Sequence, residues 1–201
     1  MISNVYRVLL DEPLGKRDPY ADYLLYDSFT DDDAVLIQNH TPEKAPEGST
    51  WSAYGGSAKI SSNTIVATGT HTKFRIDVGS ANVIVTFRIK PTTLSYARAE
   101  MRRSSETDKI STLLRQDINQ INMYYYDPGA VSIDAAAWSP TAGQWYDIEQ
   151  SIDSAHDIYA NIDTVEFLSG NEGGNLDGGT EIAFWLADGW VLDLVTVKDA
   201  G

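Results

Sequence analysis

The chain has 201 residues and no cysteine, and its 15 basic and 29 acidic side chains give a formal net charge of -14. The missing cysteine excludes disulfides and thiolate metal sites and fits synthesis in a reducing cytoplasm. The negative charge disfavours nucleic acid and anionic membranes as partners. The sequence has no apolar run long enough for a transmembrane helix, and its start lacks the pattern of a secretory signal, so we expect no export by a signal peptide.

Residues 1–21 differ in character from the rest of the chain. Pro13, Gly15 and Pro19 interrupt any regular structure there. We expect this segment to be an extended N-terminal arm or linker that is held only where something packs on it. The remaining residues, 22–201, are expected to form one domain.

The domain is predicted to consist of short strands, of which Asn82–Lys90 (NVIVTFRIK) is the clearest because its apolar residues alternate at period two. The other candidate stretches, in chain order, are Tyr23–Phe29, Thr50–Tyr54, Ser57–Ile60, Thr64–Ala67, Lys73–Val78, Leu94–Arg103, Ile110–Arg115, Asn119–Tyr126, Val131–Ile133, Gln144–Ile152, Ile158–Ile162, Thr164–Leu168, Thr180–Leu186 and Trp190–Lys198. A helical turn around Glu106–Leu114 is the best exception. Many short strands separated by turn residues predict an all-β, antiparallel sandwich of two sheets.

Aromatic residues gather in the second half of the chain. Sugar rings stack on exposed aromatic faces, which makes Trp138, in a loop-like stretch, the leading candidate for glycan binding. Tyr124 and Tyr126 are further candidates, although strand alternation leaves open whether that pair or Met123 and Tyr125 is buried. Ordinary packing is the alternative for each of these residues. Two more aromatic residues are expected in the core, Trp145 and Trp185.

Two acidic loops offer hard oxygen ligands of the kind that calcium prefers. One contains Asp31 and Asp33, and the other contains Asn171 and Asp177. Neither loop has the ligand order of a helix–loop–helix calcium site, and a solvated acidic loop is the alternative. We therefore expect no resident cofactor, with calcium as the ion to test.

No catalytic constellation stands out. The three histidines, His40, His71 and His156, lie in no nucleophile motif. Asp147 and Glu149 share a strand face with a separation of roughly 7 Å along the strand, a spacing that could suit an inverting glycoside hydrolase. An outward-facing solvated strand gives the same pattern. We predict that the protein is not an enzyme.

The order of several landmarks resembles concanavalin A-like, laminin-G-type jelly rolls, in particular those of bacteriophage structural and surface-attachment proteins. The landmarks are Tyr26–Asp31 (YDSFTD), His40–Pro42, Trp51, Ser57–Thr68, Asn122–Tyr126 (NMYYY), Gln144–Ile148 and Leu192–Val197. The likeness covers about residues 22–198 and implies a two-sheet jelly roll. Some relatives are glucanases with a Glu-x-Asp-x-(x)-Glu strand, and Asp147–Asp153 lacks that spacing.

The resemblance leads to a hypothesis about function. A non-enzymatic structural component of a phage-like particle, in a capsid decoration or a tail, would use the arm of residues 1–21 to anchor to other virion subunits. It would be oligomeric in that assembly, made in the host cytoplasm and located in the virion. The alternative is a carbohydrate-binding module that recognises a host-surface glycan, and one protein can do both.

Overall fold

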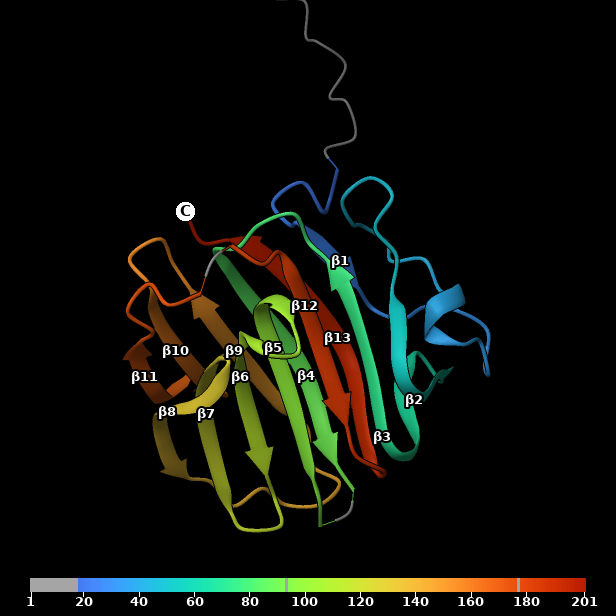
Figure 1. The fold of residues 1–201 in the computed structure, drawn as a ribbon. Helices are drawn as coiled ribbons and strands as arrows, with labels where there is room; N and C mark the ends of the chain where they lie inside the picture. The colour runs from blue at the N-terminus through green and yellow to red at the C-terminus, as the bar shows by residue number, and fades with distance from the viewer. Residues whose placement is uncertain (1–17, 93, 177) are drawn as a thin grey trace, which may run out of the picture.

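The computed structural model describes residues 18–92, 94–176 and 178–201. These residues form thirteen strands and one short 3-10 helix, which confirms the all-β prediction (Figure 1). The elements are β1 (Leu25–Asp27), η1 (Ile37–Asn39), β2 (Ser52–Ser61), β3 (Thr64–Asp77), β4 (Val83–Pro91), β5 (Tyr96–Ser105), β6 (Asp108–Arg115), β7 (Gln120–Asp127), β8 (Gly129–Ala137), β9 (Tyr146–Ile152), β10 (Asp157–Ile162), β11 (Val165–Asn171), β12 (Glu181–Leu186) and β13 (Trp190–Asp199). Within the described ranges, no helix has the length and apolar character needed to cross a membrane.

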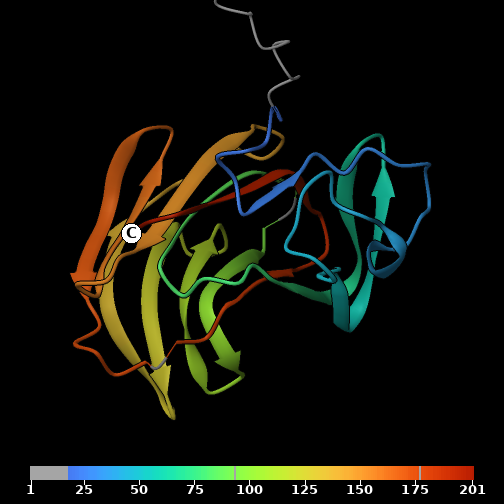
Figure 2. The ribbon, with the colours of Figure 1, turned by 90° about the horizontal axis from the view of Figure 1, so that it is seen from above.

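The strands are hydrogen-bonded in the order β11-β10-β9-β4-β13-β3-β12-β5-β6-β7-β8, with β1 added to β13 and β2 added to β3. The fourteen-residue β3 joins the two layers, because Ile65 and Val66 pair with β13 whereas Thr72–Asp77 pairs with β12. We call β11-β10-β9-β4-β13 the back sheet and β3-β12-β5-β6-β7-β8 the front sheet. Seen from above, the β2–β3 hairpin (teal) and the β10–β11 hairpin (orange) lie on opposite sides of the molecule (Figure 2).

The core lies between the two sheets and follows directly from strand alternation. Val83, Val85, Phe87 and Ile89 of β4 are each at most 1% exposed, as the sequence predicts. The ring of Phe87 meets the ring of Phe184 from β12 edge-on at 5.2 Å, which joins back sheet to front sheet. Burying each such side chain contributes about 1.5–3 kcal/mol.

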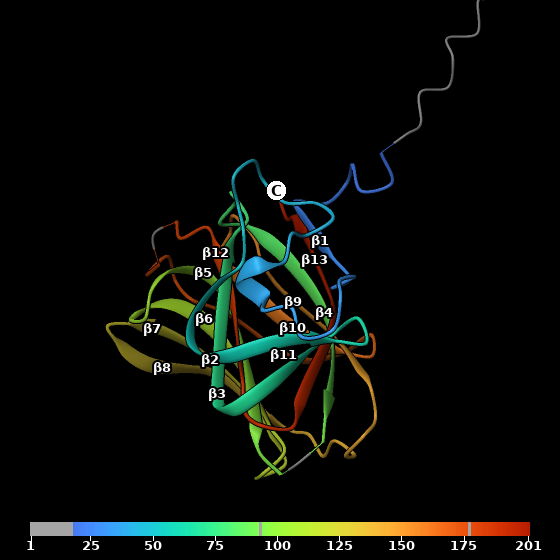
Figure 3. The ribbon, with the colours of Figure 1, turned by 90° about the vertical axis from the view of Figure 1, so that its right-hand side faces the viewer.

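The two sheets also approach each other at their outer edges. A Cβ on Gly170 of β11 would lie 2.3 Å from the side chain of Ile133 in β8, so a larger residue at that position would force Ile133 to move. The opposite side carries the β2–β3 hairpin, against which the η1 segment lies (Figure 3). A bridge between Leu36 and Lys59 ties that segment to β2. The sandwich is therefore nearly closed on one side and extended by the hairpin on the other.

The structure differs from the sequence expectations in two segments. The prediction of a helical turn around Glu106–Leu114 is wrong, because residues 108–114 belong to β6. The six central residues of β6 are buried, and its backbone pairs with both β5 and β7. Residues 18–21 of the expected arm pack on the domain, where the ring of Tyr20 lies 4.4 Å from that of Tyr26. Most of the arm, residues 1–17, lies outside the described residues.

Candidate functional site

The outer face of the front sheet, which points away from the core, is lined by aromatic and basic side chains. Strand register places Trp185 of β12 between Lys73 of β3 and Arg98 of β5. We call this surface the aromatic–basic face. Its members are Tyr54, His71, Lys73, Arg75, Tyr96, Arg98, Arg103, Lys109, Tyr124, Tyr126 and Trp185.

Trp185 lies at the centre of the aromatic–basic face. The Lys73 ammonium is 3.9 Å from its ring centroid, and the Arg98 guanidinium is 4.5 Å away. The ring of His71 packs edge-on against the indole, with centroids 5.2 Å apart. The tilted ring of Tyr96 lies 6.1 Å from the indole, and its hydroxyl is 3.1 Å from Nε2 of His71. These contacts fix the indole and place two cations beside it, each contact being worth about 0.5–2 kcal/mol.

The expectation that Trp185 belongs to the core is therefore wrong. The neighbouring residue Phe184 is 1% exposed and faces the core, and alternation turns Trp185 to the outer face, where it is half-buried. Its indole Nε1 is buried without a hydrogen-bond partner among the described residues. Trp145 is also half-buried, and Arg88 and Lys90 lie 5.1 and 4.6 Å from its ring.

Tyr54 reaches the face because β2 contains a bulge at Gly55 and Gly56. Gly56 has a φ of 66°, and a Cβ there would lie 2.4 Å from a backbone oxygen of β3, so both its conformation and its contacts require glycine. The bulge brings the Tyr54 ring within 5.4 Å of Arg75 and 5.0 Å of Arg103. Burial, and then the charge of Glu100, raises the pKa of Tyr54.

A buried ion-pair network supports the face from below. Glu100 is 1% exposed and lies 3.0 Å from the Lys109 ammonium, 3.2 Å from Nε of Arg103 and 3.5 Å from Nη1 of Arg98. Because three cations share this one carboxylate, their side chains are held in fixed positions.

A hollow of about 400 Å³ adjoins one end of the aromatic–basic face. Arg75 and Glu181 form its wall on the sheet side, and residues 47–50 form the opposite wall. Its size falls in the range of pockets that hold small ligands. Arg75 pairs with Glu181 at 3.1 Å, so the hollow offers both a donor and an acceptor of hydrogen bonds.

Tyr124 and Tyr126 are placed on this same outer face. Met123 is fully buried and Tyr125 packs against the core, so alternation turns the other two tyrosines outwards, where both are half-buried. Their ring centroids are 6.4 Å apart, and the Lys109 ammonium is 5.3 Å from the ring of Tyr126. The alternative that the sequence left open is thereby resolved, and glycan binding by this pair stays a prediction.

Trp138 is not an exposed platform, and that expectation is wrong. The side chain is 6% exposed, and its ring packs edge-on against Tyr146 at 5.4 Å. The chain turns inward after β8, where the backbone N–H of Trp138 donates to the carbonyl of Asn119. The ring therefore packs in the core, since burial removes its large apolar surface from water.

The calcium candidates in the first acidic loop have separate partners. One oxygen of Asp31 accepts the backbone N–H of Asp32 at 2.8 Å and the other lies 3.3 Å from Nδ1 of His40, whereas Asp33 accepts the backbone N–H of Ser62 at 2.7 Å. The hydrogen bond from Asp32 and then that from His40 lower the pKa of Asp31. Both carboxylates thus serve local turn structure.

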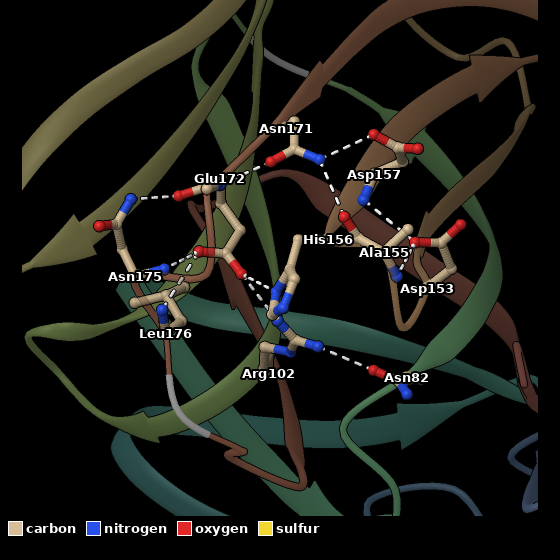
Figure 4. Close-up of polar contacts among 11 residues, drawn as sticks. Asn82, Arg102, Asp153, Ala155, His156, Asp157, Asn171, Glu172, Asn175 and Leu176 are labelled. Carbon is tan, nitrogen blue, oxygen red and sulfur yellow. Dashed lines mark hydrogen bonds and ion pairs between the residues drawn. The ribbon is translucent and has the colours of Figure 1, made fainter.

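The second loop is held by the polar contacts drawn in Figure 4. The amide of Asn171 donates to Asp157 at 2.8 Å and to the carbonyl of Ala155 at 3.0 Å, and its oxygen accepts the N–H of Gly173. Asn171 therefore acts in the structure as a link between the loop and the β9–β10 turn. Asp177 lies outside the described residues.

One group of potential metal ligands does occur in the described part of the chain, namely Asp27, His40 and Glu43, whose ligand atoms lie within 4.8 Å of one another. Asp27 already accepts hydrogen bonds from protein donors through both oxygens, and one of those donors is the indole of Trp51 at 2.5 Å. Glu43 accepts the hydroxyl of Thr30 at 2.7 Å. Since these oxygens are used by the protein itself, we assign the group a structural role.

His40 gives this group a dependence on pH. Burial alone would lower the pKa of His40, but hydrogen bonds and charges from Asp27 and then Asp31 raise it overall. A raised folded-state pKa means that the stabilisation is complete below the unfolded value of about 6.5 and is lost as the pH rises through the folded value. We expect the stability difference between the wild type and His40→Gln to narrow between pH 6 and pH 9, measured by urea unfolding. A difference that is constant or grows with pH would contradict this assignment.

The carboxylates on the back sheet lie on its outer face. Asp147 and Glu149 line a hollow of about 190 Å³. Asp147 lies 3.8 Å from the guanidinium of Arg88, and Glu149 accepts the amide of Asn161 at 3.1 Å. This is the arrangement of a solvated strand face, which was the alternative interpretation of the sequence.

Comparison with known proteins gives the fold. No family model and no curated protein sequence matches the chain. Solved structures that resemble it include the carbohydrate-binding module CBM66 from Bacillus subtilis (TM-score 0.62, 9% identity, 74% of this chain and 95% of that one). The galectin LEC-6 of Caenorhabditis elegans is also similar, with a TM-score of 0.52 and 15% identity over 69% of this chain and 99% of that one. The carbohydrate recognition domain of Emp46p in its potassium-bound form has a TM-score of 0.58 and 10% identity over 84% of this chain and 97% of that one. These likenesses establish a galectin-like jelly-roll β-sandwich, compatible with the concanavalin A-like fold that the sequence suggests.

Proposed function

We propose that the protein is a non-enzymatic carbohydrate-binding module whose ligand lies on the aromatic–basic face. The observation that carries the proposal is the indole of Trp185, fixed between Lys73 and Arg98 on the outer face of the front sheet. Glycan sites combine aromatic rings with hydrogen-bond donors that are set in advance by the scaffold. Tyr124 and Tyr126 extend this surface on one side, and solved structures of similar fold are described as carbohydrate-binding proteins.

The test compares two tryptophans with opposite placements. Trp185→Ala should reduce affinity for a glycan found on an array by tenfold or more, a loss of about 1.4 kcal/mol. The lost ring contacts should also lower the melting temperature, so affinity is measured on protein shown to be folded at the assay temperature. Trp138→Ala should instead lower the free energy of unfolding by about 3 kcal/mol, because it leaves a cavity, and the folded fraction should still bind. Titration calorimetry and thermal unfolding measure the two effects. Unchanged binding by Trp185→Ala would contradict this location of the site.

Assembly into a phage-like particle stays a prediction. Residues 1–17, which would form most of the anchoring arm, lie outside the described residues, and no finding connects the fold with virion subunits. We keep glycan binding as the leading function because named side chains on the front sheet support it.

A further inference from the structure

We infer that the glycan bound by the aromatic–basic face carries acidic groups, which Lys73 and Arg98 hold on either side of Trp185. This inference rests on the proposed function and adds the chemical class of the ligand. The acidic group is a carboxylate of a sugar acid or a sulfate ester, both of which present an oxyanion to the two cations.

The charge of the face is opposite to that of the chain. The whole protein carries a net charge of -14. On the aromatic–basic face, its supporting network and the adjoining end of β3, five cations stand against four carboxylates, a local excess of one positive charge. The cations are Lys73, Arg75, Arg98, Arg103 and Lys109, and the carboxylates are Asp77, Glu100, Glu106 and Glu181. Placing a positive patch on an acidic protein is a means of selecting an anionic ligand.

The excess is concentrated at Lys73 and Arg98. Within the described ranges, no carboxylate lies at ion-pair distance from Lys73, whose ammonium instead rests on Trp185 at 3.9 Å and on Tyr54 at 5.8 Å. Arg98 pairs with Glu100 at 3.5 Å, but that carboxylate also serves Lys109 and Arg103, and Nε of Arg98 is buried with no hydrogen-bond partner among the residues that the structure describes. Both cations thus retain donors that the protein does not use.

The two cations approach Trp185 from the strands on either side of β12. Lys73 and Arg98 extend from strands that flank β12, so their backbones are two strand spacings apart, roughly 10 Å. Their long side chains converge on the indole between them. A carboxylate or sulfate accepts charge-assisted hydrogen bonds from ammonium and guanidinium groups, and these are stronger than hydrogen bonds between neutral groups. His71 and Tyr96, which also contact Trp185, supply further polar atoms for neighbouring hydroxyls.

The test is a glycan array in which each acidic glycan has a neutral counterpart of the same backbone. Polygalacturonate and its methyl ester form the carboxylate arm, and dextran sulfate and dextran form the sulfate arm, in about 150 mM salt so that long-range repulsion is screened. We expect the acidic member of at least one pair to bind ten times more tightly or better. The arm that responds identifies the oxyanion.

Variants test whether the preference for acidic glycans depends on the aromatic–basic face. Lys73→Gln should reduce affinity for the acidic glycan at least fivefold and leave any affinity for its neutral partner unchanged. Lys59→Gln is the matched control, since Lys59 is exposed on β2 away from this face and should alter neither affinity. Equal binding of acidic and neutral members, or no effect of Lys73→Gln, would overturn the inference while the proposed function stands. A blank array from folded protein would overturn both.

Discussion

Asp27→Ala is expected to lower the free energy of unfolding by about 4 kcal/mol and leave the protein mostly unfolded at modest urea concentrations. Asp27 is fully buried, and its carboxylate accepts the indole N–H of Trp51 at 2.5 Å and the backbone N–H of Phe29 at 2.8 Å. Nε2 of His40 lies 2.8 Å from the same carboxylate. Alanine would leave these donors buried without an acceptor, and the raised pKa of His40 would fall once its closest negative charge is gone.

Urea unfolding at pH 6 measures this loss below the unfolded-state pKa of His40 of about 6.5, where the raised folded-state pKa of the wild type favours the charged ring. The control is Asp31→Ala, which removes the second carboxylate beside His40, at 3.3 Å, from an exposed position, and should cost far less. If Asp27→Ala unfolds at nearly the wild-type midpoint, Asp27 does not organise this part of the domain.

Glu172→Gln is expected to destabilise the fold by about 3 kcal/mol or more. Figure 4 shows Glu172 at the centre of its contacts, with one oxygen 2.8 Å from Nη1 of Arg102 and 2.5 Å from Nδ1 of His156. The other oxygen accepts the N–H groups of Asn175 and Leu176 at 2.5 and 3.1 Å. Both charged side chains are at least 95% buried, so an amide at position 172 would leave the guanidinium buried without its counter-charge.

A double variant separates the charge effect from lost hydrogen bonds. Arg102→Met in the Glu172→Gln background removes the unpaired cation, and we expect it to regain part of the lost stability. Arg102→Met alone should also be destabilised, because it leaves the Glu172 carboxylate buried without its counter-charge. Thermal and urea unfolding of the four proteins complete the cycle. A double variant that loses the sum of the two single losses would show that the ion pair is not what holds this loop.

The sequence predicts the layered architecture well because its most regular strand has one purely apolar face. In β4 the alternation of Val83, Val85, Phe87 and Ile89 with polar residues leaves a single choice of core face. Prediction from alternation fails where both faces of a strand are buried. In β6 the ion pairs of the outer face cover Lys109 as completely as the core covers its neighbours, so no period of two survives in the burial pattern.

The candidate site is harder to predict because its residues meet only through register. Phe184 and Trp185 are adjacent aromatics, and composition alone does not tell which one faces the core. Lys73 and Arg98 alternate with buried neighbours on their own strands, which is a local signal that both point outwards. Their meeting at Trp185 follows only from the register of β12. The opposite error arises at Trp138, where turn residues after β8 suggest an exposed loop although the ring packs inward.

The near approach of β8 and β11 also bears on how the protein behaves at high concentration. These strands end the hydrogen-bonded path, and each would normally present unpaired backbone groups to a neighbouring molecule. Because Ile133 sits on Gly170, the two ends shelter one another and leave little room for strand addition from outside. A larger residue at position 170 would push β8 and β11 apart and expose the edges of both strands. We therefore expect a larger residue at position 170 to increase self-association at high concentration.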